Sequence, residues 1–104
     1  MSVLVSFAMF PTDKGSSVST YVSRIIKMIR EEGVDYKLSA MGTLFETPDM
    51  PSALKILEKA YTELSADCER VYSVVNFDIQ TNKPMGRLKG KIESIENKIG
   101  LVNH

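Results

Sequence analysis

Residues 36–47 read YKLSAMGTLFET, and this short stretch decides how the rest of the chain is arranged. Apolar and polar residues alternate in its first half, which is the period of a β-strand. Gly42 breaks the alternation, and the residues after it resume an extended, partly β-branched pattern. The stretch therefore predicts a β-hairpin with strands at 35–40 and 43–47.

A pattern of helical period flanks the hairpin on each side. Ahead of it, Ser17 is positioned to cap a helix that ends at Gly33 and carries one apolar stripe of Val18, Val22, Ile25, Ile26 and Ile29. Behind it, residues 48–51 open a second helix, since proline is tolerated in a first turn. The apolar stripe of this second helix is Ala53, Leu57, Ala60, Tyr61 and Leu64.

Two longer strands are predicted outside these helices, at residues 3–10 and 70–79. Residues 81–89 form a polar loop with proline and glycine, and residues 91–99 have the spacing of a short closing helix. The order strand–helix–strand–strand–helix–strand is that of a ferredoxin-like α+β sandwich. We therefore expect one domain over residues 1–104, with a four-stranded antiparallel sheet, two helices on one face and a short C-terminal helix.

Composition and charge narrow the classes of partner. The 13 basic and 13 acidic side chains cancel, whereas a general binder of nucleic acid or of anionic membranes shows a basic excess. A single cysteine, Cys68, cannot form a disulfide within the chain, which favours a reducing compartment. The first residues have a strand pattern and not that of a signal peptide. We expect a cytoplasmic protein with no nucleic-acid or membrane partner.

The first and last strands are almost continuously apolar, with VLVSFAMF at 3–10 and VYSVVNFDI at 71–79. A sheet covered by helices on one face only should instead alternate cleanly. The second face, with Leu4, Ala8, Phe10, Tyr72 and Val74, therefore needs a cover, and we predict a homo-oligomer, dimer or tetramer, that joins through the sheet faces. The alternative is that the closing helix and some tolerated apolar exposure suffice.

A few polar residues interrupt the apolar strands: Ser6, Thr43, Glu46, Asn76 and Asp78. In one interpretation they line a pocket for a small polar heteroaromatic molecule. In the other, Glu46 reaches water near a strand end or pairs with a lysine across the sheet, and Asp78 is solvated near a strand end. Thr43 and Glu46 have opposite parity, so both can line one pocket only at a bulge, a strand end or a subunit junction.

The residues needed for catalysis and for metal binding are scarce. The sole histidine is His104, the last residue, and Cys68 has no upstream histidine to activate it. The strand at 42–47 has one aromatic residue, no basic residue and one acidic residue, which does not fit RNA recognition on this fold. We expect a protein that is not an enzyme, with no catalytic residues and no metal site.

Several segments resemble the YkoF-like thiamine-binding protein family. They are residues 17–22, residues 40–46 with the Met-Gly-Thr-x-x-Glu element, residues 69–72, and residues 91–96. The resemblance implies a ferredoxin-like fold, dimers or tetramers built through the sheets, and thiamine or its hydroxymethylpyrimidine half as the bound ligand, with no other cofactor.

The chemistry of an aminopyrimidine suggests roles for the polar residues. A carboxylate can accept from the exocyclic amine, so we expect Glu46 to do this, with Thr43 and Asn76 completing the hydrogen bonds. Ser6 and Ser19 are further candidate ligand-binding residues. The alternative function is a structural or regulatory homo-oligomer that binds no vitamin and in which the polar strand residues pair with one another.

Overall fold

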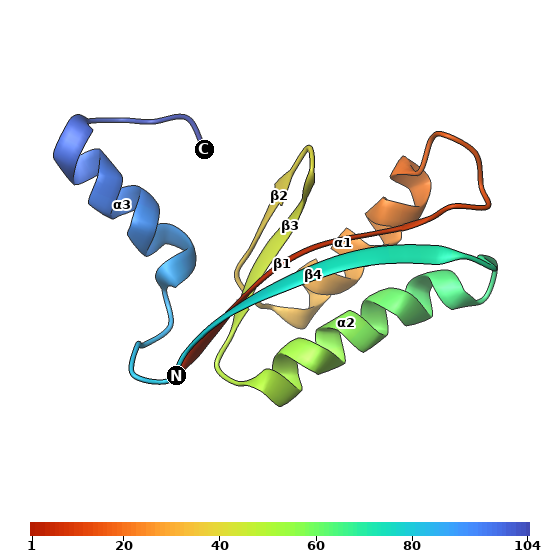
Figure 1. Ribbon diagram of the computed structural model, residues 1–104, viewed down its shortest axis with the longest axis horizontal. Coiled ribbons are helices and arrows are strands. Elements are labelled where there is room, and N and C mark those ends of the chain that lie inside the picture. Colours follow the sequence, from red (N-terminus) through yellow and green to blue (C-terminus); the bar gives the residue numbers. More distant parts are fainter.

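Seven elements follow one another in the computed structural model, which describes residues 1–104 (Figure 1). They are β1 (Ser2–Pro11), α1 (Ser19–Glu32), β2 (Tyr36–Ser39), β3 (Gly42–Thr47), α2 (Met50–Ser65), β4 (Val71–Gln80) and α3 (Arg87–Ile99). The predicted βαββαβ order with a closing helix is confirmed.

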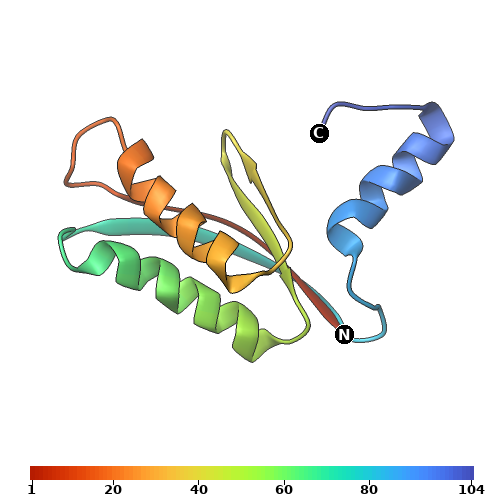
Figure 2. The ribbon, with the colours of Figure 1, turned by 180° about the vertical axis from the view of Figure 1, so that it is seen from behind.

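The four strands form one antiparallel sheet in the order β2-β3-β1-β4. β1 lies between β3 and β4, with Val5 opposite both Phe45 and Phe77. Helices α1 and α2 lie side by side on one face of this sheet (Figure 2). This is the ferredoxin-like sandwich that the sequence predicts.

The hydrophobic core fills the space between the sheet and the two long helices. β1 alternates, so Val3, Val5, Phe7 and Met9 are buried under the helices. The ring of Phe7 meets that of Phe45 edge to face, with centroids 5.7 Å apart. The helices contribute the following buried side chains: Ile25, Met28 and Ile29 from α1, and Ala53, Ile56, Ala60 and Leu64 from α2.

The structure corrects three local predictions about the helices. No side chain caps α1, and Val18 occupies the cap position that was predicted for Ser17. In α2, Ala53, Ala60 and Leu64 are buried as predicted, but Tyr61 is exposed and Ile56 is buried instead. The closing helix begins at Arg87, within the predicted loop, since Gly86 provides the left-handed turn before it (φ 108°).

The second face of the sheet is largely open. It carries the even-numbered residues of β1, β3 and β4, which the register places together. Tyr72 and Val74 expose 54% and 45% of their surface there, and Leu44 is also exposed. Only α3 lies on this side, and it meets the sheet at one end through Leu88. No helix in the structure combines the length and apolarity that a membrane crossing requires.

Candidate functional site

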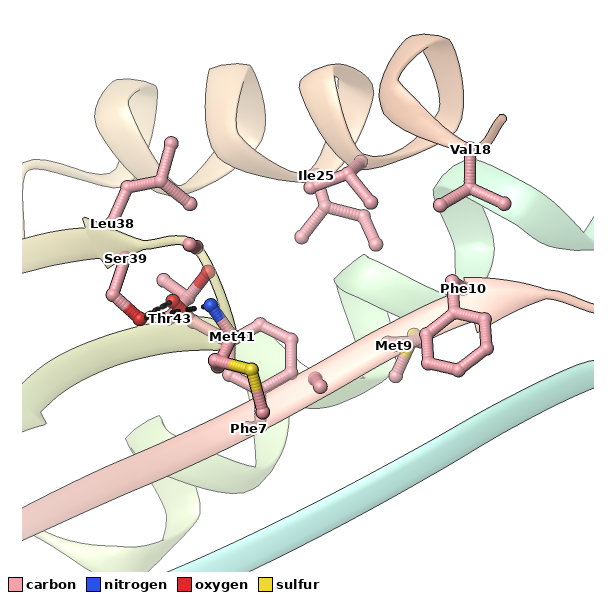
Figure 3. Close-up of a pocket in the computed structure, with 13 residues that line it drawn as sticks. Phe7, Met9, Phe10, Val18, Ile25, Leu38, Ser39, Met41 and Thr43 are labelled. Carbon is pink, nitrogen blue, oxygen red and sulfur yellow. Dashed lines mark hydrogen bonds between the residues drawn. The ribbon is translucent and has the colours of Figure 1, made fainter. Parts of the chain in front are cut away.

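A cavity of about 320 Å³ lies between the first half of α1, the end of β1 and the β2–β3 hairpin tip (Figure 3). Ten of its 13 lining residues are apolar. Phe7, Met9 and Phe10 come from β1, Ile25 comes from α1 and Val18 from the cap position before it, and Leu38 and Met41 come from the hairpin. Small-molecule sites in proteins begin at roughly 300 Å³ and are mainly apolar, so the cavity can hold a small flat ring.

Two hydroxyl groups supply the side-chain polarity of this cavity. Thr43 is buried on the helix side of β3. Ser39 lies at the hairpin tip, where its hydroxyl donates to the carbonyl of Gly42 at 3.0 Å and accepts from the N–H of Met41 at 3.3 Å. A few fixed polar groups in an apolar cleft can orient a heteroaromatic ring.

The hairpin tip is held close to β1 by a glycine. A Cβ atom at Gly42 would lie 2.9 Å from the backbone oxygen of Phe7, which is too close for any other residue without a shift of the backbone. The missing side chain therefore sets the distance between the hairpin and the strand at the cavity wall.

A second, more polar hollow adjoins this cavity along α1. It shares Val22 and Leu38 with the cavity and adds Ser19 and Ser23. Lys27 and Arg30 give the hollow a positive charge. A ligand that extends from the cavity past Leu38 would meet hydroxyl groups and two cations.

Glu46 lies on the opposite face of the sheet and is completely buried. Its carboxylate accepts hydrogen bonds from the hydroxyl of Ser2 and from the first amides of α3: Gly86 at 3.1 Å, Arg87 at 3.2 Å and Leu88 at 3.4 Å. Burial by itself raises the pKa of the Glu46 carboxyl, but these hydrogen bonds outweigh burial and lower the pKa below its ordinary value. Glu46 thus caps α3 as an anion.

Arg87 completes this anchor, although the polar sequence around it predicts a loop. Its guanidinium donates to the hydroxyl and carbonyl oxygens of Ser2 at 3.0 and 2.8 Å, and it pairs with the Asp78 carboxylate at 3.1 Å. The spacing of Leu88 from Ile92 would have extended the helix back to this point. Together these bonds fix the start of α3 to β1, β3 and β4.

The structure does not bring the five predicted ligand-binding residues together. Thr43 lines the cavity, and Ser19 lines the adjoining hollow. Ser6 and Asn76 face each other across β1 and β4 on the open face, where Glu46 also lies. The opposite parity of Thr43 and Glu46 thus separates the candidates onto two faces of one sheet.

The remaining chemically reactive side chains lie outside the cavity. Cys68 is buried, and burial followed by the nearby Asp67 carboxylate raises the pKa of its thiol. His104 lies near Lys37, with Nδ1 3.2 Å from Nζ. Histidine, cysteine and carboxylate side chains do not gather in groups of three or more that could hold a metal ion.

Comparison with known proteins decides the family. The family model described as thiamine-binding protein matches residues 5–96 of the chain. The chain belongs to the thiamine-binding protein family.

Several known proteins resemble this chain in both sequence and fold. A UPF0045 protein of Methanothermobacter thermautotrophicus is 32% identical over 85 residues, covering 81% of this chain and 85% of the relative. A solved structure of a hypothetical protein of Methanocaldococcus jannaschii superimposes with a TM-score of 0.79, at 29% identity, over 90% of this chain and 95% of that one. The name UPF0045 states no function, and no enzyme family is indicated.

A more distant structure shows the fold alone. It is a Thermotoga maritima protein whose name proposes a role in thiamine biosynthesis or salvage, with a TM-score of 0.77 and 16% identity over 91% of this chain and 99% of that one. In this member of the family, the Met-Gly-Thr-x-x-Glu element has two structural roles. Its methionine, glycine and threonine line the cavity, and its glutamate holds α3.

Proposed function

We propose that the protein binds thiamine or its hydroxymethylpyrimidine half in the cavity beside the hairpin tip, without catalysing a reaction. Membership of the thiamine-binding family supports the ligand class. The observation that carries the proposal is the apolar cavity with the hydroxyls of Ser39 and Thr43 in its wall. The rings of the ligand would contact Phe7 and Ile25, and its nitrogen atoms would meet the hydroxyls.

Titration calorimetry with thiamine, hydroxymethylpyrimidine and their phosphate esters tests this proposal. The esters belong in the series because Lys27 and Arg30 in the adjoining hollow would favour an anionic extension. Thr43→Val removes the hydroxyl while keeping the branched shape. We expect affinity to fall by about 0.5–1.5 kcal/mol, the usual net value of one hydrogen bond, or about 2- to 12-fold.

Thr62→Val is the matched control, because Thr62 lies exposed on α2 and its hydroxyl bonds only to the Glu58 carbonyl. This variant should bind thiamine as the wild type does. Absence of binding heat for every compound in the series would refute the proposal, and an unchanged affinity in Thr43→Val would move the ligand out of this cavity.

The assignment of Glu46 to the exocyclic amine stays a prediction, and Glu46→Gln tests it. A direct contact would lower thiamine affinity by about 1.5–3 kcal/mol, the range for a hydrogen bond to a charged group. A carboxylate that only anchors α3 would change thermal stability and leave the affinity close to that of the wild type.

The proposal includes a homo-oligomer that joins through the open sheet face, and a cytoplasmic location, since the single free cysteine suits a reducing compartment. The exposed Tyr72 and Val74 side chains support self-association. The same face supports the second candidate function, a structural or regulatory homo-oligomer without a vitamin ligand. A stable oligomer in light scattering, together with no binding heat in the titrations, would identify this second function.

A further inference from the structure

Helix α3 carries an apolar stripe that its own protomer covers only at one end. Leu88, Ile92, Ile95 and Ile99 recur at helical spacing. Their exposure rises along the helix from 9% at Leu88 to 38% at Ile95 and 74% at Ile99. Figures 1 and 2 agree that the helix stands away from the sheet beyond its first turn. A helix with one apolar stripe normally packs that stripe against another element.

The position of α3 is fixed by its first turn. Three backbone amides bind the buried Glu46 carboxylate, and the Arg87 guanidinium binds Ser2 and Asp78. An anchored start determines the direction of the helix, so the far end cannot fold back over the whole open face of its own sheet. The stripe and the sheet face therefore both stay uncovered in a single chain.

The uncovered sheet surface has the chemistry to receive such a helix. Phe10 and Tyr72 place their rings 5.8 Å apart across β1 and β4, and Val74 lies exposed on the same face. These residues lie at the end of the sheet opposite to Ser2, where α3 is anchored. They form an apolar surface that is not covered by any element of its own chain.

We propose that the α3 stripe of one copy packs on the open sheet face of a second copy. The α3 stripe of the second copy packs in turn on the open sheet face of the first. Both surfaces are present on every chain, so a two-fold axis can pair them twice in one dimer. Stable complexes bury roughly 1,200–2,000 Å², and a reciprocal dimer contributes two helix–sheet contacts toward that area. The inference rests on the proposed self-association and is independent of the ligand.

Ile99→Lys tests the helix side of this interface. Because Ile99 is mostly exposed in a single protomer, the substitution should leave the folding of that protomer intact. We expect self-association to weaken by at least about tenfold in size-exclusion chromatography with light scattering, because a charged side chain would have to be buried in the apolar contact. Val74→Lys on the sheet face should give the same shift.

Leu54→Lys is the matched control, since Leu54 is an exposed leucine on α2, in the helix layer on the other side of the sheet. The oligomeric state of the Leu54→Lys variant should equal that of the wild type. A wild-type protein that stays monomeric at working concentrations, or an Ile99→Lys variant that assembles normally, would overturn the inference.

Chemical cross-linking identifies which surfaces meet. Two separately tagged variants, Ile99→Cys and Val74→Cys, are mixed and treated with a short thiol-reactive cross-linker, with the wild type controlling for the buried Cys68. We expect the mixed pair to be the main product. Products that join only Val74→Cys to itself would show sheet-on-sheet contact instead and would overturn the inference. Calorimetry with thiamine tests ligand binding separately, so the proposed ligand and the proposed α3–sheet interface can each be refuted without the other.

Discussion

At the scale of the residue, Glu46 shows how a buried carboxylate is stabilised without a cationic partner in direct contact. Its oxygen atoms accept from one hydroxyl and from three amides at the start of α3. The amides at a helix N-terminus have no partner within the helix and favour negative charge. The Glu46 carboxylate and the amides at the start of α3 therefore supply each other's hydrogen-bond partners.

Glu46→Gln should destabilise the fold, because an amide group places N–H donors where the carboxylate accepts them. We expect a loss of about 1–3 kcal/mol in the free energy of unfolding at neutral pH, measured by urea denaturation. Glu31→Gln, at an exposed position on α1, is the control and should be close to neutral.

The comparison of wild type with Glu46→Gln also gives a prediction for the pH dependence of stability. The folded protein lowers the pKa of Glu46 below the ordinary 4.5. The ionised carboxylate therefore contributes stability above the unfolded pKa, and this contribution is lost as the pH falls through the folded pKa. The difference in stability between wild type and Glu46→Gln should shrink on acidification, and a difference that grows instead would contradict the assigned hydrogen bonds.

At the scale of the element, the hairpin tip forms one wall of the cavity because Gly42 allows it to approach β1. Gly42→Ala would put a methyl group 2.9 Å from the Phe7 carbonyl oxygen and force the hairpin outward. We expect a loss of about 1–3 kcal/mol in stability, with weaker thiamine binding in calorimetry.

Gly90→Ala is the matched control for this substitution. Gly90 lies within α3 with open space around its Cβ position, so alanine should stabilise the helix by about 0.5–1 kcal/mol. Opposite signs for the two glycines are expected in thermal denaturation. Equal effects would show that close approach at Gly42 does not matter.

The sequence predicted the type and order of the elements because the period of apolar residues depends mainly on local geometry. The end of α1 at Gly33 follows from its left-handed conformation (φ 75°), which favours glycine. The start of α3 has no comparable capping signal in the neighbouring sequence, because its capping group is Glu46, 40 residues away, and only the spacing of Leu88 from Ile92 indicates it. Thr43 and Glu46 occupy odd and even positions of one strand, so the sequence places them on opposite faces of the sheet. Only the packing of the helices shows which face carries the cavity.

At the scale of the whole molecule, the open sheet face and the α3 stripe are two apolar surfaces without a cover. The proposed self-association would stabilise the folded state by mass action. The thermal midpoint of the wild type should therefore rise by a few degrees for each tenfold increase in protein concentration. Ile99→Lys should remove this dependence, as measured by differential scanning calorimetry over a range of concentrations.

The bond between Glu46 and Gly86 also has a consequence for folding during synthesis. The hairpin leaves the ribosome 40 residues before the Gly86 amide that donates to the Glu46 carboxylate. Until then, the carboxylate lacks its hydrogen-bond partners at the start of α3, so its burial is unfavourable. Burial of Glu46 is therefore coupled to the emergence of the helix that carries the uncovered stripe.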